Sequence, residues 1–99
     1  ETEIVYQAAL TKYKGKVIQF TNCQAYPGQM TFKSSTRIML DSTSPDPQTI
    51  VVGKSSFSFD GYDFSTMVLP KVTTPTTILV DCKSGGTTQY SVAKIVVQP

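Results

Sequence analysis

Two cysteines, Cys23 and Cys82, are the residues in this 99-residue chain best suited to chemistry. They could form a disulfide in an oxidising compartment or remain two buried thiols in the cytosol, and a chain of this size favours the bridge. The chain has no Cys-x-x-Cys pair and no histidine. Thioredoxin-type redox chemistry and ordinary zinc sites are therefore excluded, and catalysis lacks its commonest proton carrier.

Carboxylates and tyrosines are the other candidates. Four aspartates flank expected loops: Asp41, Asp46, Asp60 and Asp63. They lack the alternating spacing of an EF-hand, so we interpret them as solvated turn residues rather than calcium ligands. A small hydrolase is a weaker hypothesis, because without histidine a serine nucleophile would need Lys or a carboxylate as its base. Tyr26 and Tyr62 fall in or beside turns and could stack on a sugar or a peptide.

Composition and charge exclude several classes of partner. The chain is 39% hydrophobic and 16% charged, with a net charge of +2. This charge is too weak to indicate a nucleic-acid partner, which would require clustered phosphate contacts. No apolar run approaches the roughly 20 residues that cross a bilayer. The chain begins at Glu1 without an initiator Met, which is typical of a mature or trimmed fragment.

A strand over residues 77–82 anchors the expected fold. Ile78, Val80 and Cys82 share one parity, so this strand should turn all three side chains toward the core. Further strands are expected at residues 3–10, 17–22, 29–34, 36–41, 48–52, 55–59, 62–69 and 89–98. Periodicity is least decisive for residues 3–10, because their Gln-Ala-Ala-Leu stretch also tolerates a helix.

Alternation within the strands predicts which side chains are buried. In the strand at residues 36–41, Ile38 and Leu40 should face the core, with Arg37 and Met39 facing solvent. About eight short strands, regular turn signals and no convincing helix predict an all-β fold. We expect an antiparallel Greek-key sandwich or barrel that occupies residues 1–99 as one domain.

The order of these pieces from Pro27 onward resembles the cupredoxins, the blue-copper fold. The matching pieces are a proline leading into a strand, a strand with a polar loop, an aromatic hairpin and a strand ending in cysteine: residues 27–33, 36–47, 57–69 and 77–82. The resemblance implies that Gln48 lies near the position of the first copper-binding histidine. It also implies that Cys82 lies at the position of the copper-binding cysteine.

The missing ligands set the functional expectation. Type 1 copper is held by two imidazoles and a thiolate, and this chain has no histidine. Blue-copper electron transfer is therefore excluded, and we expect no cofactor. The alternative is a degenerate cupredoxin that binds Cu(I) through its cysteines and a methionine. Met30, Met39 and Met67 are available for that role, although we interpret Met30 and Met67 as core residues and Met39 as a surface residue.

An immunoglobulin-like sandwich is the rival fold. Its inter-sheet bridge joins cysteines at a separation similar to the spacing of about 60 positions here. Two companions of that bridge are missing. The chain has no Trp to pack on it, and Val80 stands where a tyrosine corner would place Tyr.

The cupredoxin resemblance also implies where the bridge lies. It places a Cys23–Cys82 disulfide at the former metal position. If Ile18 and Phe20 face the core, strict alternation turns Cys23 outward. The strand must therefore end early or bulge near Asn22.

We therefore predict a non-catalytic structural or recognition module that is closed by a disulfide and is located outside the cytoplasm: periplasmic, cell-surface or secreted. It would act alone or as part of a longer envelope or secreted protein. Its partner would be an unidentified protein or glycan. The candidate binding surface is Tyr26, Gln48 and Tyr62, at the end where the resemblance implies that the loops around Tyr26, Gln48 and Gly85 gather.

Overall fold

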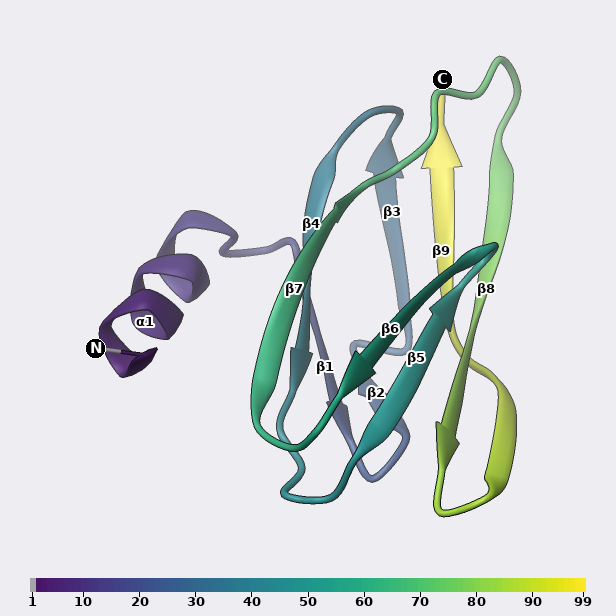
Figure 1. Ribbon diagram of the computed structural model, residues 1–99. Coiled ribbons are helices and arrows are strands. Elements are labelled where there is room, and N and C mark those ends of the chain that lie inside the picture. The colour runs from purple at the N-terminus through teal and green to yellow at the C-terminus, as the bar shows by residue number, and fades with distance from the viewer. Residues whose placement is uncertain (1) are drawn as a thin grey trace.

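The structure is a two-sheet sandwich with one helix at its side (Figure 1). This computed structural model describes residues 2–99, with side chains from Val5 onward. These residues form one helix and nine strands: α1 (Thr2–Lys12), β1 (Val17–Thr21), β2 (Gln24–Tyr26), β3 (Gln29–Lys33), β4 (Arg37–Ser42), β5 (Gln48–Val52), β6 (Ser55–Phe59), β7 (Asp63–Val68), β8 (Thr76–Ser84) and β9 (Thr87–Gln98). The strands are ordered β2-β1-β4-β7 in a four-stranded sheet and β3-β9-β8-β5-β6 in a five-stranded sheet.

The mostly-β sandwich is confirmed, but its pairing is mixed rather than purely antiparallel. β1 pairs with β4 and β3 pairs with β9 in parallel, whereas the other pairs are antiparallel. The chain leaves the four-stranded sheet after β2 and enters the five-stranded sheet at β3, so β3 lies beside a strand distant in sequence. Strand β2, three residues long, was not expected, because so short a segment carries no readable alternation.

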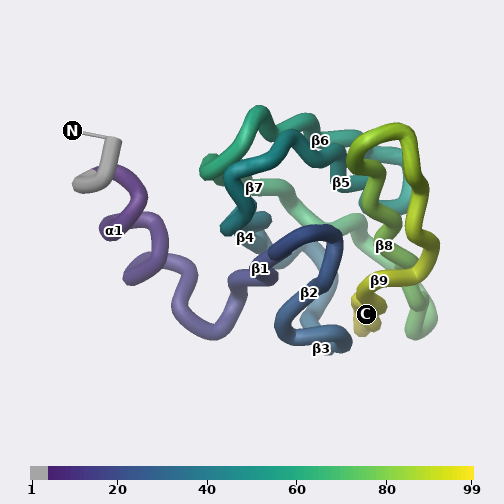
Figure 2. Tube along the Cα trace, turned by 90° about the horizontal axis from the view of Figure 1, so that it is seen from below, coloured from purple at the N-terminus to yellow at the C-terminus, as the bar shows by residue number. Residues whose placement is uncertain are grey.

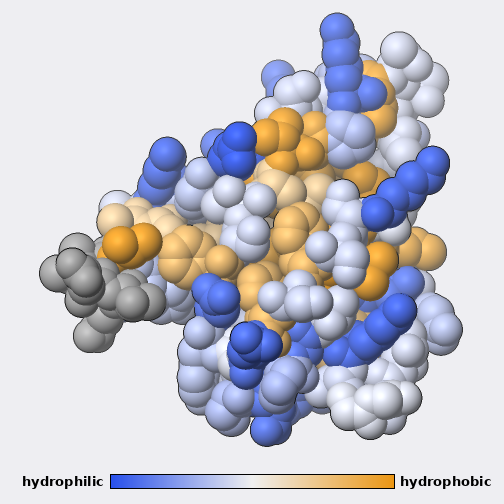
Figure 3. Space-filling model, in the orientation of Figure 1, coloured by the Kyte–Doolittle hydropathy of each residue, from blue (hydrophilic) through white to orange (hydrophobic). Residues whose placement is uncertain are grey.

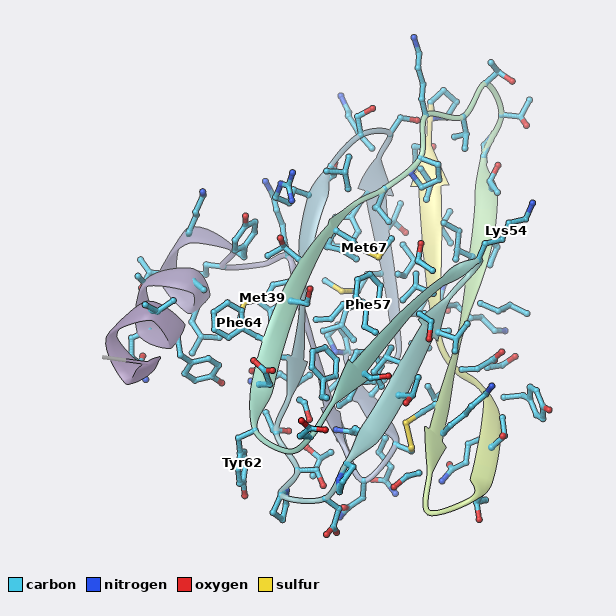
Figure 4. All side chains as sticks on the ribbon, in the orientation of Figure 1. Met39, Lys54, Phe57, Tyr62, Phe64 and Met67 are labelled. Carbon is cyan, nitrogen blue, oxygen red and sulfur yellow. A yellow bond between two sulfur atoms is a disulfide. The ribbon has the colours of Figure 1, made fainter. Side chains whose placement is uncertain are left out.

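The core lies between the two sheets and follows the expected parity. Ile38 and Leu40 of β4 are fully buried, as are Val80 and Cys82 of β8. The core also contains Ile18, Phe20, Ile50, Val52, Phe59, Leu69, Ala93, Ile95 and Val97. Figure 4 shows Phe57 and Met67 between the sheets, where both pack against this core. Burial of these apolar side chains is the main force that holds the sheets together.

The prediction of a strand at residues 3–10 is wrong, because this segment lies within helix α1. Gln, Ala and Leu are good helix formers. The segment forms no strand pairing with either sheet. Viewed end-on in Figure 2, α1 lies outside the sandwich and joins it through β1. No helix among residues 2–99 is long and apolar enough to cross a membrane.

The prediction that Met39 lies at the surface is also wrong, and helix α1 explains why. Met39 is fully buried although it shares the outward parity of β4 with Asp41. Asp41 accepts a hydrogen bond from Tyr6 of α1, so this outer face of the four-stranded sheet is the face that α1 meets. Alternation shows which face a side chain occupies, but it cannot show that a helix covers that face.

Candidate functional site

A disulfide joins the two sheets at one end of the sandwich. Cys23 lies in the turn between β1 and β2, and Cys82 lies in β8 of the other sheet, with their Cα atoms 5.4 Å apart. Both cysteines are buried. Asn22 and Cys23 have φ angles of 49° and 63°. This left-handed two-residue turn ends β1 early and points Cys23 inward, as the predicted bridge requires.

Gln48, the first residue of β5, lies beside this disulfide with its side chain only 3% exposed. Its Nε2 donates to the carbonyl oxygen of Phe20 at 3.0 Å and to Oγ of Ser42 at 2.7 Å. Its Oε1 accepts from the backbone N–H of Cys23 at 3.3 Å. The same oxygen lies 3.6 Å from Sγ of Cys82. This last approach is a contact rather than a hydrogen bond, because a disulfide sulfur carries no proton.

This donor set does not fit type 1 copper. The sulfur of Cys82, which the resemblance implied for the position of the copper-binding cysteine, is bonded to a second sulfur and offers no thiolate. The amide of Gln48, which it implied for the position near the first histidine, already uses both Nε2 hydrogens within the protein. Imidazoles are absent from the sequence. Among residues 5–99, whose side chains the structure describes, no group of three or more Cys, Asp or Glu is arranged to hold a metal ion.

Several loops meet at the disulfide end of the sandwich. Ser44 donates to the side-chain oxygen of Asn22 at 2.8 Å. A Cβ on Gly61 would lie 2.9 Å from the carbonyl oxygen of Pro45, so two loops approach too closely there for a larger residue. Gln48 and Gly85 both line a hollow of about 290 Å³. The loops around these two residues therefore lie close together. The prediction also named the loop around Tyr26, and Tyr26 does not line this hollow.

The candidate binding residues do not form a single patch. Tyr26 is 62% exposed and ends β2, at one edge of the four-stranded sheet. Tyr62 is 72% exposed and directly precedes β7, at the opposite edge of that sheet. Gln48 is buried between the sheets and presents almost no surface. The two tyrosines are thus accessible to partners, whereas Gln48 is enclosed by the protein.

Sequence reasoning missed a second cluster, between α1 and the four-stranded sheet. Tyr6 donates its hydroxyl proton to Oδ2 of Asp41 at 2.6 Å, and Nε2 of Gln19 donates to the same oxygen at 3.2 Å. The Tyr6 ring lies 5.8 Å from the ring of Phe64, which points from β7 toward α1 in Figure 4. The sequence carries no signal for this cluster, because α1 is not amphipathic and the Tyr6–Asp41 contact spans 35 positions.

A cavity of about 460 Å³ opens at this cluster. Its lining is formed by Tyr6, Asp41, Ser42, Thr43, Tyr62, Asp63 and Phe64. Figure 3 shows a tan and orange surface running from α1 onto the body of the sandwich. We call this cavity the helix–sheet pocket.

Asp41 lies within the helix–sheet pocket and changes the acidity of Tyr6. Burial raises the pKa of Tyr6 to about 12, and the hydrogen bond to Asp41 and the charge of that carboxylate add to the rise. All three causes favour the neutral phenol. Tyr6 is therefore a hydrogen-bond donor to Asp41 throughout the physiological pH range.

Comparison with known proteins identifies the fold through structure alone. No family model matches the chain, and no curated protein matches its sequence. The structure is similar to a reduced Cu(I) form, at pH 4, of an amicyanin variant, with a TM-score of 0.61 and 9% identity over 83% of this chain and 80% of the other. A second amicyanin variant with Cu(I) gives a TM-score of 0.60 and 10% identity over the same shares.

A Cu-containing nitrite reductase from Thermus scotoductus SA-01 is also similar, with a TM-score of 0.60 and 15% identity. The match covers 84% of this chain and 22% of the enzyme. Such low identities carry information on fold and none on activity. They favour the cupredoxin expectation over the immunoglobulin-like alternative. This chain has a cupredoxin-like fold, with a disulfide at Cys23 and Cys82.

Proposed function

We propose that this chain is a non-catalytic structural or recognition module that binds no type 1 copper and works outside the cytoplasm. One observation carries the proposal: the amide oxygen of Gln48 lies 3.6 Å from the disulfide sulfur of Cys82. The two positions that the cupredoxin resemblance assigns to copper ligands are thus adjacent. Their chemistry is that of a packed core.

The residues that the alternative Cu(I) site would need do not support copper binding. Soft Cu(I) binding needs thiolate or thioether donors, and both cysteine sulfurs are bonded to each other. Met39 lies on the outer face of the four-stranded sheet, whereas Met30 and Met67 pack against the core. Three methionines divided in this way support packing rather than coordination.

The disulfide also supports the proposed location. Such bridges form and persist in the periplasm, at cell surfaces and in secreted proteins, where thiols are not kept reduced. On a rigid sandwich, loops and exposed aromatic residues are the usual places for recognition. Tyr26 and Tyr62 are the exposed tyrosines we assign to contact with a protein or glycan partner.

Metal analysis tests this proposal. We expect protein that has been incubated with Cu(II) and dialysed to contain far less than one copper per chain and to show no intense visible absorption. Ellman's reagent, applied under denaturing conditions, should detect no free thiol. A copper-to-protein ratio near one, with a thiolate-to-copper absorption band, would overturn the proposal.

A further inference from the structure

The helix–sheet pocket has the size of a ligand site and an unusual combination of side chains. Its volume of about 460 Å³ lies within the roughly 300–1,000 Å³ of pockets that bind small molecules. Three aromatic residues line it: Tyr6 from α1, Tyr62 directly before β7, and Phe64 from the start of β7. Its other main feature is a pair of carboxylates, Asp41 and Asp63.

The charge of this pocket differs in sign from the net charge of the chain. Among the described residues, its lining includes two aspartates and neither Lys nor Arg, although the chain as a whole has a net charge of +2. Asp63 is exposed, whereas Asp41 is 1% exposed. A ligand in the pocket would therefore meet one carboxylate at the rim and one at the base.

The carboxylate of Asp41 lacks a positive partner in the contacts that hold it. Its two side-chain hydrogen bonds come from the hydroxyl of Tyr6 and the amide of Gln19, and both donors are neutral. A carboxylate removed from water is stabilised far better by an opposite charge than by neutral donors alone. A cation that entered the pocket would supply this missing charge.

The aromatic residues that line the pocket favour an organic cation over an inorganic one. The faces of Tyr and Phe rings attract cations, and this attraction is stronger where water is excluded. An inorganic cation would instead require several oxygen ligands in a closed shell. A neutral sugar could stack on Tyr62, but it would leave the charge of Asp41 unpaired.

We propose that the helix–sheet pocket binds a small organic ammonium ion, which is held between the rings of Tyr6, Tyr62 and Phe64 and paired with the carboxylates of Asp41 and Asp63. This inference rests on the recognition role proposed above and names its ligand class. It places the site on the outer face of the four-stranded sheet, away from the position that corresponds to the copper site of cupredoxins.

Choline is the probe, and its neutral isostere 3,3-dimethyl-1-butanol is the control ligand. We expect the amide resonances of residues 62–64 to shift with choline in a titration followed by NMR. Choline should bind at least about 10-fold more tightly than the alcohol. Equal binding of the two ligands would overturn the proposal, as would binding of methyl glucoside at these resonances without binding of choline.

Two variants and matched controls test the residues. Asp41→Asn keeps the shape of the side chain and removes its charge, so it should weaken choline binding at least about 10-fold. Asp46→Asn removes the same charge from an exposed loop and should have no effect. Unchanged affinity in Asp41→Asn would overturn the proposal.

If Asp41→Asn does not fold, Tyr62→Ala decides, because Tyr62 is 72% exposed and its loss should leave the fold intact. Tyr62→Ala should weaken choline binding several-fold, whereas Tyr26→Ala, at the opposite sheet edge, should not. Unchanged binding in Tyr62→Ala would then overturn the inference. The copper measurements described above would still decide the proposed function separately, since they do not involve this pocket.

Discussion

Oε1 of Gln48 lies 3.6 Å from Sγ of Cys82, at the end of the sandwich where the strand-connecting loops meet. The same oxygen accepts the N–H of Cys23, the other half of the disulfide. Gln48 therefore connects both cysteines to Ser42 of the four-stranded sheet. The hydrogen bonds of Gln48 thus connect β5 to β1, to β4 and to the disulfide.

Replacement of Gln48 by Leu should destabilise the fold by about 3 kcal/mol. The backbone N–H of Cys23 would lose its acceptor and Oγ of Ser42 would lose its donor, both in a buried setting. Urea denaturation measures the loss. Gln29→Leu, at an exposed position on β3, is the matched control and should change stability by less than about 0.5 kcal/mol. Equal effects of the two substitutions would show that the Gln48 network is dispensable.

Loss of the disulfide should cost on the order of 4 kcal/mol. The bridge closes a loop with a sequence separation of 59, and this constraint reduces the entropy of the unfolded chain. The double variant Cys23→Ala, Cys82→Ala should therefore unfold at a much lower urea concentration than the oxidised protein. Reduction of the native protein should produce a similar shift. A double variant as stable as the parent would contradict this prediction.

Tyr26→Ala and Tyr62→Ala should each change the melting temperature by less than about 3 °C, because both side chains are largely exposed. Phe59→Ala is the positive control. Phe59 is 3% exposed in the core, and its truncation should cost about 3 to 5 kcal/mol. Calorimetry measures all three variants. If either tyrosine variant lost several degrees, that tyrosine would be a packing residue rather than a contact residue.

The docking of α1 should weaken at high pH. The pKa of Tyr6 is raised from 10.0 to about 12, so the folded state favours the neutral phenol. Its stabilising contribution is complete below about pH 10 and is lost as pH rises through about 12. In a titration followed by tyrosine absorbance, one of the five tyrosines should ionise late. Tyr6→Phe should remove that late step, and a titration curve without any late step would refute the assignment.

The sequence correctly predicted which side chains enter the core wherever their burial depends only on alternation along a strand. Ile78, Val80 and Cys82 share a face, and Val80 and Cys82 are fully buried, because the period of a strand fixes which side chains point together. The early end of β1 could also be predicted, since an inward Cys23 requires a break after Phe20. The positive φ angles of Asn22 and Cys23 provide that break.

Features that depend on distant contacts could not be predicted in this way. The burial of Met39 depends on a helix that meets its sheet face, and residues 3–10 do not reveal whether they will pair with a strand. The parallel partners β3 and β9 begin at Gln29 and Thr87, and no local pattern connects them. The Tyr6–Asp41 hydrogen bond depends on the same docking of α1, so the helix–sheet pocket could not be inferred either.

The position of the disulfide also determines how the chain would respond to mechanical force. Residues between Cys23 and Cys82 lie inside a covalent loop and cannot be extended by tension between the two ends of this chain. Only the 22 residues before Cys23 and the 17 after Cys82 could lengthen, for a reach of about 140 Å, compared with about 350 Å for the reduced chain. In the oxidised state, the strands from β2 to β7 would thus be shielded from stretching while β1 and β9 bear the load.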